Sequence, residues 1–516
     1  MRQAGFWSFA HASPAAVAVI EASGKTVTAG ELVAESHRLV HALRALGLQR
    51  GDCVAVAVPN CREVLALFMA ATQAGMYLVP VNWHLTGPEI AYILQDSNAR
   101  VFVASERIAR AARDAADTAG VPVSGRIAIG TIEGFAPFSQ LTDGQPSTPP
   151  TDRSAGAAMT YTSGTTGRPK GVRRPVGLAD PDTVAAAQAG FLSLFGIMPG
   201  SAGVHLVCAP LYHTAVLNFA TNHLHLGHTL VLMDKWTPEL TLECIAKYRV
   251  TNSHMVPTMF NRLLKVPEAE RARYDVSSLT HVIHSAAPCP IETKRGMLAW
   301  WGPCIYEYYS ASEGGGTLAT PEQWLAKPGT VGKAWPISQI RILDDDKQPV
   351  PQGATGTVWI RMGDFRFEYH KDAKKTADAW NDGFFTVGDA GYLDEDGFLF
   401  LCDRKADMII AGGVNIYPAE VEAQLVTHPA VLDAAVFGIP HPDLGEEVKA
   451  VVQPVAGTAG SEALAVELLA YLSERVAKYK LPRSIDFVAE LPRDPNGKLY
   501  KRKLRDPYWQ GRATAI

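Results

Sequence analysis

The sequence lacks the long apolar run that a membrane-spanning helix requires. An apolar stretch near the N-terminus covers only residues 15–20 and is closed by Glu21 and Lys25, whereas a span needs roughly eighteen residues. The seven cysteines are scattered without any C-x-x-C pair, which argues against zinc sites and against a disulfide framework. These absences predict a cytoplasmic protein with reduced thiols and no membrane span.

The chain also lacks a broad field of one charge. Its 48 Lys and Arg residues nearly balance 52 Asp and Glu residues, and the formal net charge is −4. This balance disfavours nucleic acid as the main partner, so an anionic ligand would need a local cluster of cations. At 516 residues the chain exceeds one ordinary hydrophobic core, and at least two domains are expected.

One local cluster of cations and donors lies at residues 161–171, which hold three glycines, four Ser or Thr hydroxyls, Arg168 and Lys170. Glycines let backbone N–H groups approach an anion, hydroxyls add donors, and the cations supply charge-assisted contacts. A run rich in Gly, Ser and Thr is often only a solvated loop, but the cations and a short apolar entry at 157–159 favour a polyphosphate-binding loop. It is not the P-loop of NTPases, because Gly171 follows Lys170 where that motif needs Ser or Thr.

Short apolar strands alternate with helical patterns over most of the chain. A strand at 53–58, a helix at 63–74 and a strand at 77–81 have a βαβ order, and further strand-like runs lie at 100–103, 205–208, 230–233 and 281–284. We predict an α/β fold whose large N-terminal domain, residues 1–403, has parallel-rich sheets flanked by helices. Beyond Gly397 the pattern changes to a helix at 418–425, strands at 434–438 and 448–452, and a helix at 463–476, which predicts a small α+β domain, residues 404–516.

Four more clusters follow the predicted phosphate loop: Tyr309-Ser310-Ala311-Ser312-Glu313, residues 383–389, residues 403–409, and Pro495-Asn496-Gly497-Lys498. In this order, and over essentially the whole chain, the five motifs resemble the adenylate-forming superfamily of acyl-CoA synthetases, peptide-synthetase adenylation domains and beetle luciferases. The resemblance implies an acid–thiol ligase that uses ATP, Mg²⁺ and coenzyme A. It would form an acyl-adenylate, release pyrophosphate, and then transfer the acyl group to the thiol, with a mobile C-terminal domain serving both steps.

The resemblance also implies the site residues. Those for ATP or AMP are Thr162, Ser163, Gly164, Thr165, Thr166, Gly167, Lys170, Ala286, Ala287, Pro288, Tyr309, Ser310, Ser312, Asp389, Arg404 and Lys498. The implied catalytic residues are Lys498, Glu313, Lys170 and His213, the acyl pocket is His213, Thr214, Leu217, Gly314 and Gly315, and coenzyme A meets Gly412 and Gly413.

Each implied role suits the residue type. Glu313 offers a carboxylate to Mg²⁺, which favours oxygen ligands. Asp389 can accept from both ribose hydroxyls, and Tyr309 would lie against the adenine ring. Lys498 would bridge the acyl carboxylate and the α-phosphate as charge develops. Glycines at 412 and 413 would let a pantetheine thiol approach the backbone closely.

The chain departs from the usual pattern of the superfamily at several positions. Ser310 and Ser312 stand where Gly and Thr are usual, and Ala406 stands where many members carry an Asp or Lys hinge pivot. Thr357 replaces a common Glu. The substitution at 406 leaves the identity of the pivot open, but not the rotation itself.

The substrate and the acceptor stay open at this point. Residues 211–214 resemble the segment that lines the acyl pocket of acyl-CoA synthetases, and no Asp stands there to hold an amino group, which favours a hydrophobic fatty, aryl or branched acid. The alternatives are an amide synthetase with an amine acceptor, a luciferase-like oxygenase, and a silent nucleotide-binding or acyl-binding homologue. The expected partners are small molecules, and a homodimer is compatible with the sequence.

Overall fold

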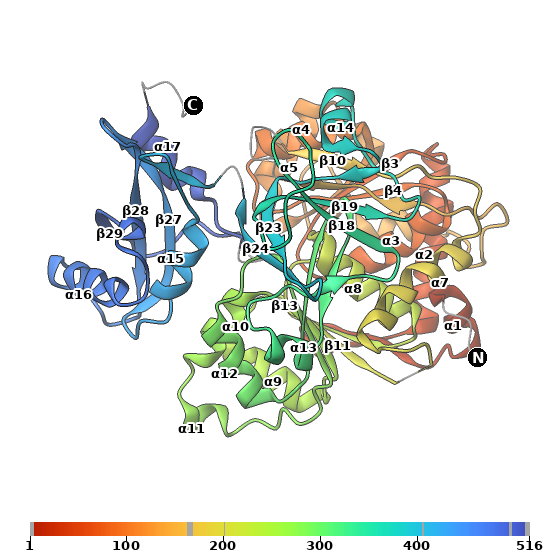
Figure 1. Ribbon diagram of the computed structural model, residues 1–516. Coiled ribbons are helices and arrows are strands. Elements are labelled where there is room, and N and C mark those ends of the chain that lie inside the picture. Colours follow the sequence, from red (N-terminus) through yellow and green to blue (C-terminus); the bar gives the residue numbers. More distant parts are fainter. Residues whose placement is uncertain (1–4, 163–168, 201, 405–406, 495–497, 511–516) are drawn as a thin grey trace. The chain divides into compact units, whose positions relative to one another are not determined.

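The computed structural model describes residues 5–162, 169–200, 202–404, 407–494 and 498–510 (Figure 1). Contacts divide the chain into two compact units. The first comprises Met1–His254, Ala272–Val282 and Asp364–Asp378, and the second comprises Met255–Arg271, Ile283–Gly363 and Ala379–Ile516. These units reflect compactness, and the expected domain boundary between residues 403 and 404 stays a prediction.

A six-stranded parallel sheet forms one layer of the first unit. Its strands, in spatial order, are β7 (Ala136–Pro137), β6 (Arg126–Ile129), β5 (Ala99–Ser105), β3 (Cys53–Ala57), β4 (Tyr77–Pro80) and β8 (Ala157–Ala158). All residues of β3 are buried, because a parallel strand is covered on both faces, and this explains its continuous apolar sequence. The predicted βαβ order is confirmed.

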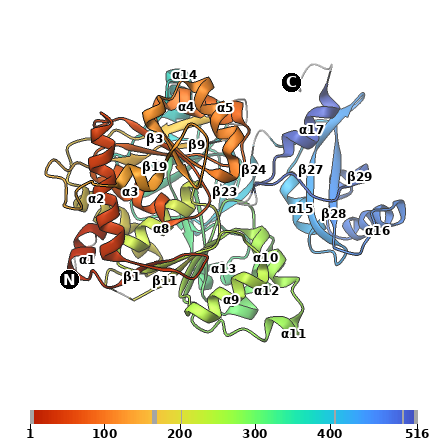
Figure 2. The same ribbon diagram turned by 180° about the vertical axis from the view of Figure 1, so that it is seen from behind.

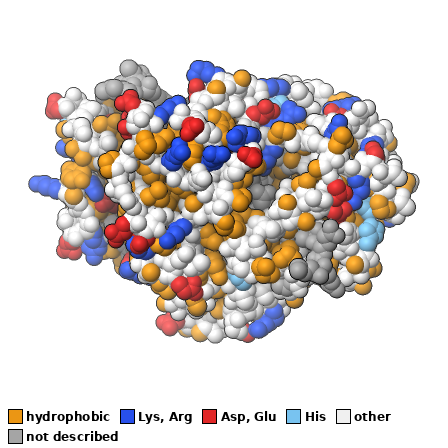
Figure 3. Space-filling model, turned by 45° about the vertical axis from the view of Figure 1, so that its right-hand side comes forward, with side chains coloured by type: hydrophobic (Ala, Val, Ile, Leu, Met, Phe, Trp, Pro, Cys, Tyr) orange, Lys and Arg blue, Asp and Glu red, His pale blue; other side chains and the backbone are white. Residues whose placement is uncertain are grey.

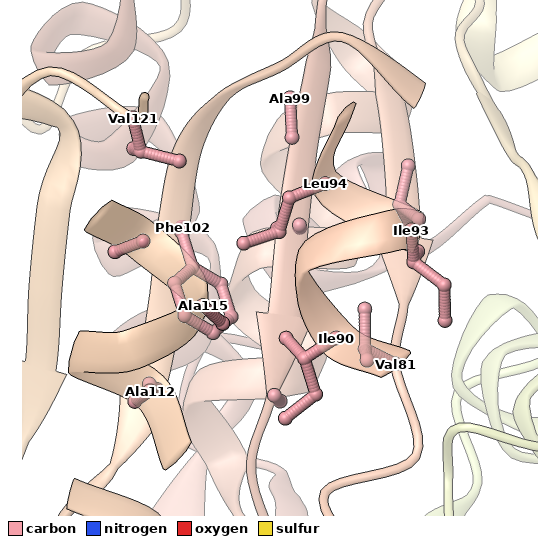
Figure 4. Packing of buried hydrophobic residues seen from close by; sticks show 14 of the residues in the cluster. Val81, Ile90, Ile93, Leu94, Ala99, Phe102, Ala112, Ala115 and Val121 are labelled. Carbon is pink, nitrogen blue, oxygen red and sulfur yellow. The ribbon is translucent and has the colours of Figure 1, made fainter. Parts of the chain in front are cut away.

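Helices α3 (Arg62–Gln73), α4 (Gly87–Ser97) and α5 (Ala109–Ala119) connect strands of this sheet. A capping box between Thr86 and Glu89 starts α4, and Asn98, in the left-handed conformation at φ 52°, ends it. Figure 4 shows Ile90 and Leu94 of α4 with Phe102 of β5, all buried in one apolar cluster. This packing holds α4 firmly beside the sheet.

The first unit contains two further sets of paired strands. One has the order β2 (Thr26–Thr28), β1 (Val17–Ile20), β12 (Thr229–Leu232), β11 (Val204–Val207) and β13 (Asn252–Met255). The other is an antiparallel sheet of β20 (Glu368–Tyr369), β10 (Lys170–Arg173) and β9 (Thr160–Thr162). The remaining helices are α1 (Phe6–Ala12), α2 (Ala29–Ala45), α6 (Phe138–Thr142), α7 (Pro181–Ala189), α8 (Thr214–His225), α9 (Pro238–Tyr248) and α14 (Ala373–Ala379).

The second unit begins with helices and antiparallel strands. Strands β15 (Ile305–Ala311), β16 (Gly314–Ala319) and β17 (Lys333–Ala334) pair in sequence order and follow β14 (His281–His284). A six-stranded sheet has the order β21 (Trp380–Asn381), β22 (Phe384–Phe385), β19 (Gly356–Met362), β23 (Asp389–Leu393) and β24 (Leu399–Arg404), with β18 (Ser338–Leu343) also on β19. The helices here are α10 (Pro257–Leu264), α11 (Glu268–Arg271), α12 (Ile291–Trp301) and α13 (Pro321–Ala326).

The C-terminal part of the second unit has a sheet of its own (Figure 2). Its strands are β26 (Val414–Ile416), β25 (Ile409–Ala411), β28 (Gly445–Pro454) and β27 (Val431–His441), with β29 (Ser484–Phe487) parallel to β28. Helices α15 (Pro418–Leu425) and α16 (Glu462–Ser473) cover one face, and Leu504 of α17 (Lys501–Trp509) packs on the other. The predicted α+β domain is confirmed, and α15 has the predicted bounds.

The surface agrees with the balanced composition. On the face in Figure 3, Lys and Arg side chains are interspersed with Asp and Glu side chains, and the described residues there form no continuous field of one sign. Within the described ranges, none of the helices combines the length and the apolar character that crossing a bilayer requires.

Candidate active site

The described flanks of the predicted phosphate loop form an antiparallel pair. Strand β9 runs into the loop and β10 leaves it, with Thr162 paired to Lys170 and Tyr161 paired to Gly171. Ser163, Gly164, Thr165, Thr166 and Gly167 lie outside the described residues, and their predicted roles stay predictions. The apolar entry predicted at 157–159 corresponds to β8 and the residue that precedes β9.

Two tyrosines tie these flanks to α4. Tyr161 donates a hydrogen bond of 2.7 Å to the Asp96 carboxylate, and Tyr92 donates one of 3.0 Å to the Pro169 carbonyl. Burial and the Asp96 carboxylate raise the pKa of Tyr161, so its hydroxyl stays a donor at neutral pH. The entry and the exit of the loop are therefore both held by one helix.

Lys170 forms an ion pair with Asp372, the residue before α14, at 3.0 Å. The other oxygen of Asp372 accepts a hydrogen bond of 3.0 Å from the backbone N–H of Lys375. The hydrogen bond to Asp372 raises the pKa of Lys170, while the Lys375 N–H and then Lys170 lower the pKa of Asp372. Both groups are charged at neutral pH.

His213 is the residue directly before α8, and Asn60 holds the segment that leads to it. The Asn60 amide donates to the carbonyls of Ala209 and Met233 at 2.9 and 3.1 Å and accepts from the backbone N–H of Leu211 at 2.8 Å. One side chain thus fixes the ends of β11 and β12 and the turn that leads to His213. Thr214 follows in the first turn of α8, and Leu217 is fully buried one turn later.

Asp389, Tyr309 and Arg404 meet in the second unit. Asp389 of β23 pairs directly with Arg404 of β24, and the Arg404 Nε lies 3.3 Å from one carboxylate oxygen. The Tyr309 hydroxyl donates to the other oxygen at 2.7 Å. These three predicted nucleotide-binding residues are thus brought together by strands β15, β23 and β24.

Burial and neighbouring charges shift the pKa values of Asp389 and Lys498. Burial raises the pKa of Asp389, and Arg404 and the Tyr309 hydroxyl oppose that rise. Burial lowers the pKa of Lys498, and the neighbouring positive charge of Arg404 lowers it further. An anion arriving beside Lys498 would therefore favour its ammonium form.

Glu313 stands in the two-residue turn between β15 and β16 and is only 6% exposed. Among the residues that the structure describes, no group of three or more His, Cys, Asp and Glu side chains is arranged to hold a metal ion. A single carboxylate such as that of Glu313 still fits Mg²⁺, because this ion commonly takes one or two carboxylates and completes its shell with substrate phosphates and water.

The glycines after Glu313 have a backbone reason to be glycine. Gly314, Gly315 and Gly316 all have positive φ, at 120°, 67° and 155°. A Cβ on Gly316 would overlap the Tyr309 carbonyl, and one on Gly315 would lie 2.5 Å from the Ile360 side chain. Close packing of the hairpin thus explains these residues, and their role in an acyl pocket stays a prediction.

Three predicted nucleotide-binding residues, Ala286, Ala287 and Pro288, follow the end of β14. Ala286 has φ 77°, an unusual conformation for a residue with a side chain. Two residues before Ala286, the His284 Nε2 lies 3.4 Å from a carboxylate oxygen of Glu307 on β15, and Glu307 accepts a 2.7 Å hydrogen bond from the buried Lys294. Burial raises the pKa of Glu307 and lowers that of Lys294, while each charge stabilises the other.

Gly412 and Gly413 form the two-residue turn between β25 and β26, with φ values of 58° and 80°. Positive φ at both central residues is typical of a type I′ hairpin. Gly412 donates its N–H to the Leu444 carbonyl at 2.8 Å. Within the part of the chain that the structure describes, a Cβ on Gly413 would meet no atom within 4 Å, so the space above this residue is open there.

Sequence reasoning missed Asn60, Tyr92, Asp96 and Asp372. Asn60 carried a signal, because it follows the carboxyl end of a predicted parallel strand, where ligand sites form in such sheets. The other three carried none, since their contacts join segments 65 to 275 residues apart in the sequence. Ala406, the predicted hinge position, and residues 495–497 before Lys498 lie outside the described residues.

Comparison with known proteins finds two matching family models. Residues 6–365 match the one described as AMP-binding enzyme, and residues 420–498 match the one described as AMP-binding enzyme C-terminal domain. Two curated relatives are a fatty acid–[acyl-carrier-protein] ligase of Streptomyces coeruleorubidus, 32% identical with 96% of this chain and 94% of the relative covered, and a feruloyl-CoA synthase of Amycolatopsis, 33% identical with 98% and 99% covered. Among solved structures, the amide bond synthetase McbA of Marinactinospora thermotolerans matches with a TM-score of 0.81 and 28% identity, covering 98% of this chain and 99% of that one.

Proposed function

Because the chain belongs to the family of AMP-binding enzymes, we propose that it is an ATP-dependent carboxylate–CoA ligase that forms an acyl-adenylate and releases AMP and pyrophosphate. The family confirms the resemblance to the adenylate-forming superfamily that the five motifs indicated. Relatives named as a fatty acid–[acyl-carrier-protein] ligase and a feruloyl-CoA synthase support an acid–thiol ligase.

The arrangement around Asp389 carries this proposal. An ionised carboxylate offers about four lone-pair sites. Among the described residues, Tyr309 takes one site on one oxygen and Arg404 takes one on the other, and this leaves one site on each oxygen for a ligand. Two vicinal ribose hydroxyls would fill these two sites. A carboxylate whose two remaining acceptor sites lie on different oxygens suits the ribose of a ribonucleotide.

The chemistry needs positioning and charge neutralisation more than a protein nucleophile. A carboxylate must attack the α-phosphorus of ATP, which is already surrounded by negative charge. Lys498 would bind both anions and stabilise the charge that develops as the new bond forms. Its depressed pKa supports this role, because contact with anions restores the ammonium form that burial and Arg404 disfavour.

Glu313 would hold Mg²⁺ together with the phosphates of ATP, and the ion would neutralise the charge of the leaving pyrophosphate. Lys170 would bind the polyphosphate at the exit of the loop that Thr162 enters. The adenine ring would lie between Tyr309 and the wall formed by Ala286, Ala287 and Pro288.

The acid is a fatty, aryl or other hydrophobic carboxylic acid, held near His213, Thr214 and Leu217. The relatives support this breadth, since one is named for fatty acids and another for ferulic acid. Leu217 is fully buried on α8, and the Asn60 contacts keep the start of that helix in place.

Coenzyme A is the proposed acceptor, with its pantetheine thiol passing over Gly412 and Gly413. The open space above Gly413 supports this approach. A second candidate is an amide synthetase, favoured by the likeness to the amide bond synthetase structure. For two steps at one site, the domain 404–516 would present Lys498 first and the Gly412–Gly413 turn second.

One experiment separates these functions. Pyrophosphate release is measured over a panel of fatty, aryl and branched acids, and each active acid is then supplied with CoA, an acyl carrier protein or an amine. We expect acid-dependent release and a CoA thioester. An amide without a thioester would establish the second candidate, and ATP binding without release for any acid would indicate a silent homologue.

A further inference from the structure

Lys170 is the predicted cation for polyphosphate, yet the structure pairs it with Asp372. The register of the three-stranded sheet produces this pairing. Val172 pairs with Tyr369 and Arg173 with Glu368, so the chain beyond Tyr369 runs alongside the start of β10. His370 continues the pairing by donating its N–H to the Gly171 carbonyl at 2.8 Å.

Lys371 then turns the chain so that Asp372 faces Lys170. It has φ 55°, an uncommon backbone conformation for a residue with a long side chain. Its ammonium donates to the Asp96 carbonyl at 2.6 Å and to the Asn98 side chain at 3.3 Å, at the C-terminal end of α4. A strained residue that is held by such contacts is well determined by its surroundings.

Asp372 is fixed on its other side by α14. Besides the Lys375 N–H on its side chain, the Asp372 backbone carbonyl accepts from Thr376 through the backbone N–H at 3.0 Å and the hydroxyl at 2.8 Å. The carboxylate therefore has one position. Lys170, in contrast, carries its charge on four flexible methylene groups, and its side chain is 31% exposed.

We propose that Asp372 competes with polyphosphate for Lys170. Asp372 pairs with the Lys170 ammonium when the site is empty and pairs with it again when pyrophosphate leaves. This inference rests on the proposed function, in which Lys170 binds polyphosphate. Asp372 thereby weakens the binding of both ATP and pyrophosphate. AMP, which lacks the β- and γ-phosphates, is unaffected by the competition.

The test compares Asp372→Asn with the wild type by calorimetric titration of Mg-pyrophosphate, Mg-ATP and AMP without any acid. The asparagine oxygen still accepts from the Lys375 N–H, but the charge is gone. We expect Kd for pyrophosphate and ATP to fall by roughly three- to tenfold at low ionic strength, with a smaller change at high salt. Kd for AMP should stay the same. Asp372→Ser, which retains a good helix-capping residue, gives the same result if the asparagine variant folds poorly.

Two comparisons make the result specific. Asp378→Asn removes the same charge within α14, the helix that begins directly after Asp372. Asp378 pairs with Lys374 at 2.7 Å, and its substitution should leave all three Kd values unchanged. In a Lys170→Met background, Asp372→Asn should no longer tighten ATP binding, because no ammonium remains to be shared.

Several outcomes would overturn the competition. They are unchanged or weaker pyrophosphate binding by Asp372→Asn, an equal change for AMP, persistence of the effect in Lys170→Met, and a wild type that binds neither pyrophosphate nor ATP. The proposed function fails separately, when the wild type binds these ligands but activates no acid. In that case the ratio of variant to wild-type Kd values for pyrophosphate and ATP still tests whether Asp372 competes for Lys170.

Discussion

Replacing Tyr309 with phenylalanine tests whether the charge of Asp389 controls ATP binding. The change removes one hydroxyl and keeps the ring that would lie against adenine. The lost hydrogen bond of 2.7 Å is present in the structure without nucleotide. We expect it to persist when ATP binds, in which case its direct contribution cancels in the KM for ATP. What remains is its effect on the protonation of Asp389, whose pKa burial raises and the Tyr309 hydroxyl lowers.

The sign and the size of the effect follow from this position. As the pH falls, a proton would occupy an acceptor site of Asp389 that a ribose hydroxyl needs under the proposed function, so KM for ATP should rise. Without the Tyr309 hydroxyl the pKa of Asp389 is higher, and the rise begins at a higher pH. Hydrogen bonds to charged groups contribute about 1.5–3 kcal/mol, so KM should rise on the order of ten- to hundredfold once Asp389 is protonated.

The assay is KM for Mg-ATP from pH 5.5 to 8.5, with the acid saturating, expressed as the ratio of variant to wild type. The ratio removes the titration of ATP and of the acid, which both enzymes share. We expect a ratio near one at high pH that climbs as the pH falls. Tyr306→Phe, on the same strand, is the matched control and should give a flat ratio. A flat ratio for Tyr309→Phe would refute the role of the Asp389 charge.

Three other predictions test the remaining parts of the site. Lys498→Ala should slow adenylation by about a hundred- to thousandfold yet convert a supplied acyl-adenylate to acyl-CoA at a near wild-type rate; equal loss of both steps would contradict the two-step mechanism. Gly413→Asn introduces a residue that tolerates positive φ better than a branched residue does. It should slow thioester formation roughly tenfold or more and leave pyrophosphate release unchanged. A slowed release would show a wider disturbance of the structure. Lys294→Met should destabilise the fold by about 3–5 kcal/mol in chemical denaturation, because it leaves the buried Glu307 without its cation. Combining Lys294→Met with Glu307→Leu should recover most of that loss. A double variant as unstable as the single one would contradict this account.

Local patterns predicted the elements well where one physical cause dominated. Strand β3 was readable because burial on both faces leaves a continuous apolar run, and α15 was readable because Pro418 marks its first residue. Strand β27 is longer than predicted, since its ends are held by pairing with β28, which the hydrophobic pattern does not report.

The candidate site was likewise predictable only in part. Asp389 and Arg404 were each indicated by a motif, but their direct pairing across β23 and β24 depends on the register of those strands. Asp372 escaped prediction because an aspartate before a helix usually has a capping role, which it also has here. Only the fold brings it to Lys170. Side chains that bridge distant segments cannot be read from a chain whose register is unknown.

The pairing of Thr162 with Lys170 also bears on how such an enzyme changes over evolutionary time. These two residues are opposite each other in a backbone ladder, and Tyr92 and Tyr161 anchor the same ladder to α4. Because these contacts fix the ladder from outside the intervening segment, we expect substitutions between the two paired residues to leave the register of the strands unchanged. If this segment binds phosphate as proposed, single mutations in it would alter phosphate binding while the paired strands are inherited unchanged, both in natural variation and in engineering.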